Sequence, residues 1–404
     1  METKRILFIT HRYPKGENTI LEKDTAKALF NQGYKVVVIA PTERRNLEST
    51  HKYNDNGIEI LYVKTGNNFN QTSKLEKLVT VLTRPYLIEK SIKKYYSNEK
   101  FDLIFGYTPF MANYKLFFKL KKSYEAKLIL FLWDIFPQNG KDLGMFKNKI
   151  IFKFLKFREK MMYKVFDNII CNCEGQIDYI LKNKYKTKEK LILIRNSEVF
   201  KEKEILNKKF LKEELGYKKN DIISIFGGNM GEPQELKNIV NMINELKQYS
   251  NLKFIFLGDG TQIKNLKNLK EKNEINNLEI LDFVEREKYE KILGICDIGL
   301  ISLNKNYTVP NFPAKVTGYI KEGIPIFASL DSCSIKYLGK FIEENKIGQV
   351  AEAGNIKKMK EKFLKLAENI NQYEKKHFKN IYLKNFDVNE FANKVRKGIG
   401  ESNV

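Results

Sequence analysis

The stretch that decides the fold is Val309-Pro-Asn-Phe-Pro-Ala-Lys-Val-Thr-Gly-Tyr-Ile-Lys-Glu-Gly-Ile-Pro-Ile-Phe-Ala328. It follows the apolar run Asp297–Leu303, which is typical of a buried strand. Pro313 suits the first position of a helix because its missing N–H would have no partner there, and Gly323 with the proline two residues later ends that helix. The apolar residues that follow predict a second strand. The segment therefore predicts a βαβ unit whose helix presents N–H groups toward an anion.

Lys315 lies in the first turn of this expected helix. The helix dipole disfavours a cation at that end, so helix stability does not explain the residue. A phosphate group of a ligand does explain it. We therefore predict that Lys315 binds a phosphorylated ligand and stabilises charge on it.

The whole chain alternates strands with helices, which predicts an α/β fold with parallel, doubly wound sheets. In the first half, strands are expected at Arg5–Thr10, Tyr34–Ala40, Ile58–Val63, Leu103–Tyr107, Lys127–Leu132, Asn168–Cys171 and Leu191–Arg195. The alternation restarts with strands at Ile222–Phe226, Lys253–Leu257, Leu278–Phe283 and Ile298–Leu303. We expect an N-terminal Rossmann-like domain (1–199), a solvated Lys-rich linker (200–219), a second Rossmann-like domain (220–384) and a C-terminal helical tail (385–404).

Composition limits the possible partners and compartment. The formal net charge of +23 attracts phosphorylated ligands, anionic membranes or nucleic acid, although a general abundance of Lys and Asn explains it equally well. No apolar run approaches the roughly 20 residues that span a bilayer, and residues 1–10 lack an export signal, so a cytoplasmic protein is expected. The cysteines, His51 and His377 show no metal-ligand spacing, so no bound metal and no cofactor are expected.

Several segments together resemble a known family. Pro-x-Lys at 313–315, a Tyr four residues after the Lys, and Gly-x-Pro before a strand are similar to the donor-site signature of retaining GT-B glycosyltransferases, family 4 (group 1). The resemblance implies two Rossmann-like domains facing across a cleft, with the C-terminal helix returning to the first domain. It also implies transfer of a sugar from a nucleotide-diphosphate sugar, expected to be UDP-linked, to a glycan or polyprenyl-linked acceptor in cell-surface polysaccharide synthesis.

The resemblance carries over a set of donor-binding positions. Phe226–Gly231 is a Gly-rich turn after a strand, where backbone N–H groups can approach a diphosphate. Phe256–Gly260 is a second such turn, which a plain strand-to-helix connection explains equally well. Asp282–Val284 occupies the position where the family's backbone meets the base. The implied donor-binding residues are Gly16, Gly228, Asn229, Met230, Gly231, Gly258, Asp259, Phe283, Val284, Asn311, Phe312, Pro313, Ala314, Lys315 and Gly318.

Two residues of the first half are candidates for the acceptor. Leu132-Trp-Asp-Ile-Phe-Pro137 resembles the Asp-x-Trp-Pro segment of bacterial polysaccharide glycosyltransferases, which implies that Asp134 acts in catalysis by binding an acceptor or sugar hydroxyl. A helix N-cap is the competing interpretation of Asp134. His11 ends the first strand and is assigned to acceptor binding by the same resemblance, although a lone histidine is more often structural.

The chain departs from the family at two glutamates, which are replaced by Pro310 and Gly318. Glu322 lies one helical turn after Gly318 and therefore on roughly the same face, so it is our candidate for the missing catalytic or ribose-binding carboxylate.

The segment Met145–Val165 has seven cations and one carboxylate among bulky apolar residues. Such a helix can lie on an anionic membrane surface, or it can be a core-packing helix with a basic outer face. The first interpretation would make the protein peripheral on the inner face of the cell membrane.

Other functions stay open from sequence. A GT-B nucleotide-sugar epimerase shares the architecture, and the missing glutamates are compatible with a glycosyltransferase-like subunit that binds without catalysing. Charge alone suggests a nucleic-acid-binding protein, and we expect no nucleic acid as a partner.

Overall fold

The computed structural model describes residues 3–16, 20–68, 72–109, 113–197 and 208–400. The chain forms two compact units. Unit 1 comprises Met1–Gln138, Phe146–Val199 and Asp387–Val404, and unit 2 comprises Asn139–Met145 and Phe200–Phe386. Both are α/β units built on a largely parallel sheet, which confirms the predicted fold class.

Unit 1 contains an eight-stranded sheet in the order β3-β4-β2-β1-β5-β6-β7-β8. Every neighbouring pair is parallel except β3 with β4. The strands are β1 (Arg5–Ile9), β2 (Lys35–Glu43), β3 (His51–Asp55), β4 (Ile58–Thr65), β5 (Leu103–Tyr107), β6 (Lys127–Leu132), β7 (Asn168–Cys171) and β8 (Leu191–Leu193). The sequence did not predict β3, because this edge strand is polar and mostly exposed.

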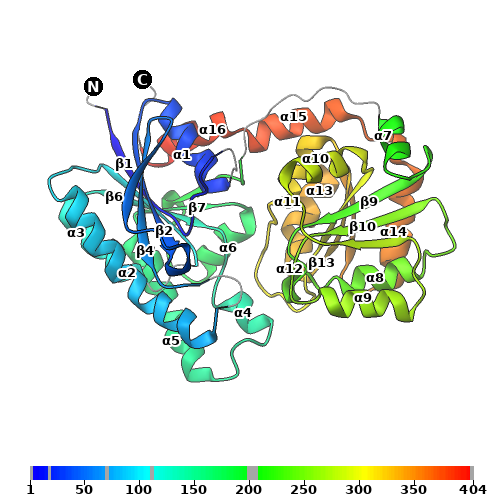
Figure 1. The fold of residues 1–404 in the computed structure, drawn as a ribbon, viewed down its shortest axis with the longest axis horizontal. Coiled ribbons are helices and arrows are strands. Elements are labelled where there is room, and N and C mark those ends of the chain that lie inside the picture. The colour runs from blue at the N-terminus through cyan, green and yellow to red at the C-terminus, as the bar shows by residue number, and fades with distance from the viewer. Residues whose placement is uncertain (1–2, 17–19, 69–71, 110–112, 198–207, 401–404) are drawn as a thin grey trace. The chain divides into compact units, whose positions relative to one another are not determined.

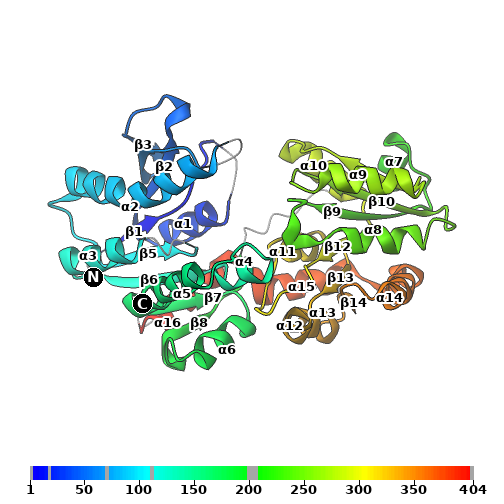
Figure 2. The same ribbon diagram turned by 90° about the horizontal axis from the view of Figure 1, so that it is seen from below.

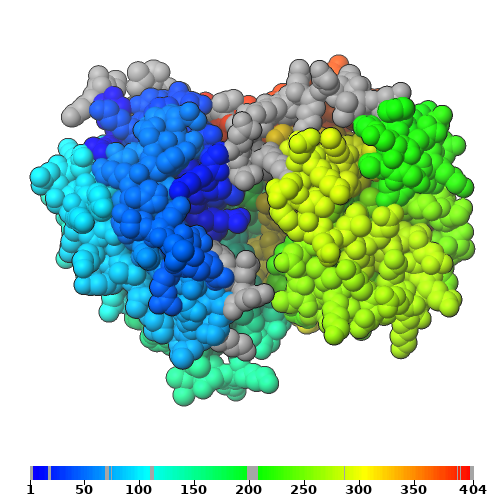
Figure 3. All heavy atoms as spheres, in the orientation of Figure 1, coloured from blue at the N-terminus to red at the C-terminus, as the bar shows by residue number. Residues whose placement is uncertain are grey.

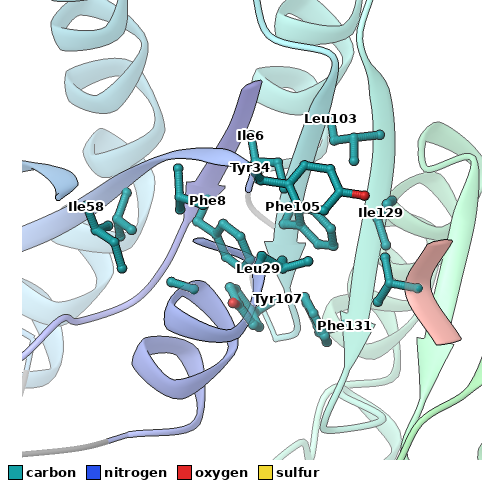
Figure 4. Packing of buried hydrophobic residues seen from close by; sticks show 14 of the residues in the cluster. Ile6, Phe8, Leu29, Tyr34, Ile58, Leu103, Phe105, Tyr107, Ile129 and Phe131 are labelled. Carbon is teal, nitrogen blue, oxygen red and sulfur yellow. The ribbon is translucent and has the colours of Figure 1, made fainter. Parts of the chain in front are cut away.

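Helices cover both faces of this sheet (Figures 1 and 2). They are α1 (Leu21–Asn31), α2 (Lys74–Tyr96), α3 (Tyr114–Tyr124), α5 (Lys149–Val165), α6 (Glu174–Lys182) and α16 (Val388–Gly398), with single turns η1 (Arg44–Asn46) and η3 (Lys188–Lys190). The core on the α1 and α16 side is rich in aromatic side chains (Figure 4). In it, Phe8 stacks on Phe105 with ring centroids 4.6 Å apart.

The C-terminal helix α16 packs into this core of unit 1. The Phe391 ring stacks on Phe131 with centroids 5.8 Å apart, and Arg396 donates from Nε to the Tyr34 hydroxyl at 3.0 Å. Lys127 Nζ donates to the Ile399 carbonyl at 2.6 Å. The last helix therefore belongs structurally to the first half of the chain.

Unit 2 contains a six-stranded parallel sheet in the order β11-β10-β9-β12-β13-β14. The strands are β9 (Ile222–Gly227), β10 (Leu252–Leu257), β11 (Leu278–Leu281), β12 (Ile298–Ser302), β13 (Ile326–Leu330) and β14 (Gly348–Glu352). From β9 the chain adds β10 and β11 on one side, and then returns to add β12, β13 and β14 on the other side. The carboxyl ends of β9 and β12 therefore form a topological switch point. Open parallel sheets bind ligands at such points.

The helices of unit 2 also lie on both faces of its sheet, with α8 and α9 opposite α10 (Figure 1). They are α7 (Lys208–Glu214), α8 (Lys237–Asn244), α9 (Ile263–Lys272), α10 (Arg286–Ile295), α11 (Lys315–Glu322), α12 (Ser332–Ser334), α13 (Lys340–Glu344), α14 (Ile356–Glu368) and α15 (Lys375–Phe386). Single turns are η4 (Glu232–Gln234), the π-helical η5 (Ile335–Gly339) and η6 (Ile370–Gln372). The short α4 (Gln138–Asp142) begins at the last residue of the first unit 1 segment.

The predicted linker, residues 200–219, is only partly described by the structure, and the described part differs from the expectation of a solvated segment. Residues 208–214 form helix α7. Lys212 is buried, and its Nζ lies 2.8 Å from a carboxylate oxygen of Asp297. Lys208 pairs with the same carboxylate. Two of the lysines that suggested a solvated segment therefore bind it to unit 2 through Asp297.

Among the described residues, no helix combines the length and apolar character required to cross a bilayer.

Candidate functional site

Two glycine-containing turns meet at the switch point of unit 2. The turn after β9 donates from Gly228 N to the Leu257 carbonyl (2.9 Å) and from Met230 N to the Asp259 carbonyl (2.7 Å). A Cβ on Gly258, which has φ +147°, would lie 2.0 Å from the Gly228 carbonyl oxygen. The second turn therefore needs glycine because the first turn lies directly against its backbone.

Backbone N–H groups of the first turn differ in whether they have partners. Those of Gly228 and Met230 are bonded, whereas no residue in the described part of the chain accepts from the N–H of Asn229 or Gly231. Asn229 is exposed, so its backbone is open to a ligand. Gly231 is buried, so its N–H is less accessible than that of Asn229. Successive N–H groups without partners at a glycine turn can form an anion-binding concavity.

Lys315, which we predicted to bind a phosphate, lies beside this turn. Its Nζ is 3.8 Å from the centre of the Phe226 ring and 3.7 Å from the position that a Cβ on Gly228 would occupy. Lys315 is half-buried, no carboxylate pairs with its amine among the described residues, and desolvation lowers the pKa of the amine to about 7. A cation held at this position by packing is ready to bind a phosphate.

The position of Lys315 is fixed by the helix that carries it. Tyr319, one turn along α11, is buried and donates from its hydroxyl to the Ile225 carbonyl at 3.0 Å. The same hydroxyl accepts from Gly227 N at 3.4 Å. A Cβ on Gly299 would lie 2.4 Å from the Tyr319 ring, so the missing side chain makes room for it. Tyr319 therefore holds α11 against β9 and β12, and this fixes the position of Lys315 four residues before it.

The helix starts later than the sequence predicted. Pro313 was expected at the first helical position, but α11 begins at Lys315 with Ala314 as its N-cap residue. The N–H groups of Val316 and Thr317 bond to the carbonyls of Pro313 and Ala314 at 3.1 and 3.0 Å. These two groups are therefore not available to an anion. The glycine turn and Lys315 remain the stronger phosphate site.

Several predicted donor residues have supporting roles in the structure. The Met230 side chain lies in the core of unit 2, and the Phe312 ring is buried against Phe341 and Phe386. Their side chains shape the loops rather than offer a ligand surface. Asp259 is exposed, and its carboxylate accepts from Gly260 N at 2.7 Å. Four other predicted residues remain at least partly accessible near strand ends or the start of α11, namely Phe283, Val284, Asn311 and Ala314.

Glu322 does not lie near Lys315. It ends α11, seven residues after Lys315, which corresponds to about 10 Å along a helix. It lines a pocket with Asp297, Ile324 and Pro325, which precede β12 and β13. Glu322 is therefore at the amino edge of the sheet, whereas the glycine turn is at the carboxyl edge. Helical periodicity placed Glu322 on the right face but at the wrong end, and it is not part of the site that we propose.

Gly318 leaves open space within α11. A Cβ there would meet no heavy atom within 4 Å, and the residue is helical. We expect Gly318→Ala to raise the free energy of unfolding by ~0.5–1 kcal/mol, because alanine loses less backbone entropy on folding. Urea denaturation measures this. Gly323→Ala is the matched control, since φ +70° and a 2.9 Å approach to Lys375 make a Cβ unfavourable there. Destabilisation by Gly318→Ala would show that position 318 is not open.

In unit 1, Asp134 and His11 come together at the carboxyl edge of β1 and β6. Thr108 Oγ1 accepts from the backbone N–H of Trp133 and Asp134 at 2.9 and 3.1 Å, which orients the segment. Asp134 is not a helix N-cap, because the next helix begins four residues later at Gln138. His11 packs edge-on against Trp133 and pairs through Nδ1 with buried Glu22 at 2.9 Å.

The Asp134 carboxylate lies in an apolar pocket of about 550 Å³ within unit 1. Although the residue retains exposed surface, desolvation by the pocket walls raises its pKa, and the charge of His11 opposes this rise. The carboxylate is accessible at this pocket and can accept a hydrogen bond from a ligand hydroxyl. The walls come mainly from α2, α5 and the residues after β5 and β6.

Gly16 lies in the loop after β1 with φ +72°. Its carbonyl accepts from Lys23 Nζ at 2.6 Å, and Lys23 also pairs with Asp55 at 3.0 Å. Lys23 is completely buried, so it anchors this loop from below. Gly16 belongs to unit 1 with the predicted acceptor residue His11, whereas the other predicted donor residues belong to unit 2.

Sequence reasoning missed several polar residues that line the Asp134 pocket, among them Arg84 and Asn113. Both are buried, at 5% and 2% exposure. A signal for Arg84 was available, because it shares four-residue spacing with Thr80, Ile88 and Ile92, all buried on α2. A cation in a buried helical stripe usually has a specific partner. No comparable signal marked Asn113, whose burial depends on long-range packing.

Residues 207–381 match the family model described as glycosyl transferases group 1. This range contains both glycine turns and Lys315. No curated protein matches the chain.

Solved structures resemble almost the whole chain at low sequence identity. Alr3699/HepE of Anabaena, in complex with UDP and glucose, has 14% identity and a TM-score of 0.66, covering 98% of this chain and 99% of its own. Sucrose-phosphate synthase of Thermosynechococcus elongatus has 10% identity and a TM-score of 0.74, with the same coverage of both chains. WaaG, a glycosyltransferase involved in lipopolysaccharide biosynthesis, has 13% identity and a TM-score of 0.62, covering 96% and 98%. These likenesses show that the fold is GT-B.

Proposed function

We propose that this protein is a glycosyltransferase that moves a sugar from a nucleotide-diphosphate sugar to an acceptor hydroxyl. The observation that carries the proposal is the pairing of Lys315 with the open glycine turn at the switch point of unit 2. This pairing lies within the range that matches glycosyl transferases group 1. The UDP and glucose bound to the similar HepE structure support a UDP-linked donor.

We propose a family 4 reaction that retains the configuration at the anomeric carbon. The bond from the sugar C1 to the diphosphate oxygen breaks, and the acceptor oxygen forms a new bond to C1. The acceptor proton passes to the leaving phosphate, so no protein base is assigned. Lys315 and the N–H groups of Asn229 and Gly231 stabilise the charge that develops on the diphosphate. Preorganised electrostatic stabilisation of this kind is usually the largest catalytic contribution.

Asp134 is proposed to bind the acceptor or sugar hydroxyl, with His11 beside it. A carboxylate that accepts a hydrogen bond from the hydroxyl positions it without removing its proton completely. The acceptor is proposed to be a glycan or lipid-linked intermediate of cell-surface polysaccharide synthesis, such as capsule or lipopolysaccharide. The similarity to WaaG supports this broader role.

The pKa of Lys315 predicts a pH dependence of UDP binding. In the free protein the amine loses its proton above about pH 7, and a bound diphosphate raises that pKa by favouring the ammonium form. Affinity should therefore be highest below pH 7 and fall by up to about tenfold per pH unit above it. Calorimetric titrations between pH 6 and 9 measure this. Lys315→Met provides the control for ionisation of UDP itself, and equal pH profiles in both proteins would contradict the assignment.

A thermal-shift screen across UDP-, GDP-, ADP- and TDP-sugars tests the proposed function. A ligand that binds the native state stabilises it, by about 2.7 kcal/mol at one hundred times its dissociation constant. We expect UDP-sugars to raise Tm most. No shift with any nucleotide sugar would exclude the function.

A non-catalytic binding subunit is the second candidate, because Pro310 and Gly318 stand where the family carries glutamates. It predicts the same thermal shift without product. A donor-only assay also separates an epimerase, which changes or hydrolyses the nucleotide sugar in the absence of an acceptor.

Helix α5 supports a proposed contact with the inner face of the cell membrane. Its first half exposes Ile150 (76%), Ile151 (52%), Phe154 (56%) and Phe157 (55%) beside several lysines. We expect the protein to float with vesicles that contain anionic lipid and to be released as salt rises, since the lysines act through screened charge. Flotation that is absent, or unchanged by salt, would contradict this contact.

A further inference from the structure

The pocket beside Asp134 has more apolar side chains in its walls than a site for a hydroxyl group needs. Leu78, Val81 and Leu82 of α2 face Phe154 and Leu155 of α5 across it. Its volume of about 550 Å³ is in the range of ordinary small-molecule sites. The walls are far more apolar than a sugar requires.

Two buried hydrogen-bond donors interrupt these apolar walls. Arg84 Nε and Asn113 Nδ2 are buried, and neither has a hydrogen-bond partner among the residues that the structure describes. Burial lowers the pKa of Arg84, and the charge of Glu43 opposes this without cancelling it. A buried guanidinium N–H without a hydrogen-bond partner in an apolar wall is costly, so it indicates that an anionic ligand completes the site.

A second cation lines the same pocket. The Arg158 guanidinium lies over the Tyr114 ring at 5.3 Å and the Phe154 ring at 5.6 Å, which holds it at the wall. Arginine suits phosphate because its planar donors can bind two oxygens at once. The pocket thus combines apolar walls, two arginines and the Asn113 amide with a carboxylate, Asp134, that is available to a hydroxyl.

The apolar surface continues outside the pocket. Leu78 and Leu82 on α2 are 55% and 61% exposed, and Phe154 on α5 is 56% exposed. In the space-filling view, α5 reaches the lower edge of unit 1 just below the atoms of α2 (Figure 3). A long chain could therefore leave the pocket along apolar side chains from both helices.

We infer that this pocket binds a lipid-linked acceptor, with its phosphate groups on Arg84, Asn113 and Arg158 and the first part of its hydrocarbon chain between α2 and α5. The inference rests on the proposed function and specifies its acceptor class. The acceptor hydroxyl would then lie toward Asp134. Of the two acceptor classes open from sequence, a free glycan explains neither the apolar walls nor the Arg84 Nε without a hydrogen-bond partner.

Trp133 lines this pocket and is the sole tryptophan of the chain, so its fluorescence reports binding there directly. Farnesyl diphosphate is the probe, with farnesol and inorganic pyrophosphate as its two halves. We expect a saturable change in Trp133 emission with farnesyl diphosphate at a concentration about tenfold or more below that needed with either half. Equal affinity for pyrophosphate would show free phosphate binding and overturn the inference, and equal affinity for farnesol would overturn the phosphate contacts.

Substitutions inside and outside the pocket test where farnesyl diphosphate binds. Leu82→Glu, inside the pocket, should weaken farnesyl diphosphate binding about tenfold or more, because a carboxylate would repel both chain and phosphate. Leu75→Glu is the matched control on the same helix, since Leu75 is 73% exposed and does not line this pocket. The control should stay within about twofold. Equal effects of the two substitutions would place the probe elsewhere.

Arg84→Met tests the phosphate contact. It should weaken farnesyl diphosphate about tenfold or more and leave farnesol unchanged, because hydrogen bonds to charged groups are the stronger ones. Folding is checked by an unchanged or higher Tm, since the substitution removes a buried unsatisfied donor. UDP affinity of each variant separates the two proposals. Binding of farnesyl diphosphate without binding of UDP would contradict the glycosyltransferase function. Binding of UDP without binding of farnesyl diphosphate would contradict only the lipid inference.

Discussion

Lys315→Met should lower sugar transfer by about 10²–10³-fold, the loss typical when one preorganised donor to a developing anion is removed. The methionine fills similar space over the Phe226 ring, so the loss reflects charge rather than packing. UDP should bind more weakly as well, because the leaving diphosphate is stabilised before and after transfer. Steady-state kinetics with a saturating acceptor, together with UDP titration, measure both effects.

The same substitution should not destabilise the free protein. The pKa of Lys315 falls from 10.5 to about 7 on folding, so the unfolded chain binds more protons between these values and stability rises with pH across them. At and below pH 7 the buried ammonium opposes folding, and methionine removes that opposition. A Tm that is equal or higher with lower activity separates a ligand role from a structural one.

Lys321→Met is the matched control for Lys315, because Lys321 lies in the last turn of the same helix. It should leave transfer unchanged and affect stability by only ~0.3–1 kcal/mol through the helix dipole. If Lys321→Met and Lys315→Met reduce transfer equally, the effect arises from general charge and the assignment of Lys315 is wrong.

Asp134→Asn should lower kcat/KM for the acceptor by about 10–100-fold, since a hydrogen bond to a charged group contributes ~1.5–3 kcal/mol. UDP affinity should be unchanged, because Asp134 belongs to unit 1 and the glycine turn to unit 2. Desolvation by the pocket walls raises the pKa of this carboxyl, so a neutral amide should be tolerated without loss of stability. Initial rates at varied acceptor concentration measure the change.

Asp178→Asn on the exposed surface of α6 is the control for Asp134, with no expected effect on kcat/KM. Loss of UDP binding in Asp134→Asn would indicate disruption of the fold rather than of acceptor binding. Full activity in that variant would remove Asp134 from the site.

The α/β fold could be predicted because nearly every buried strand is a continuous apolar run that ends in a loop. The run Ile222–Gly227 is one example. Such runs and their order along the chain can be read directly from the sequence. The placement of Lys315 could also be predicted, since the Pro-x-Lys segment combines a helix start with a preceding strand. By contrast, β3 was missed because its alternation carries polar residues on an exposed edge.

The predictions that failed at the site depended on distances and long-range contacts, which sequence periodicity does not contain. Helical spacing places Glu322 on the face of Gly318, but the distance along α11 carries it to the other edge of the sheet. The Lys-rich segment around Lys212 looked solvated, although its partner Asp297 lies 85 residues away in sequence. The Asp134 pocket forms between helices α2 and α5, which are remote in sequence, so helical spacing could mark Arg84 as buried but could not place it beside Asp134.

The central claim is that the glycine turn and Lys315 bind the diphosphate of a nucleotide sugar. Calorimetric titration of UDP into the protein at pH 6.5 tests it most directly, because binding is measured without any knowledge of sugar or acceptor. The account predicts saturable one-site binding to the wild-type protein and at least about tenfold weaker binding to Lys315→Met. No binding at millimolar UDP, or equal affinity in both proteins, would contradict it.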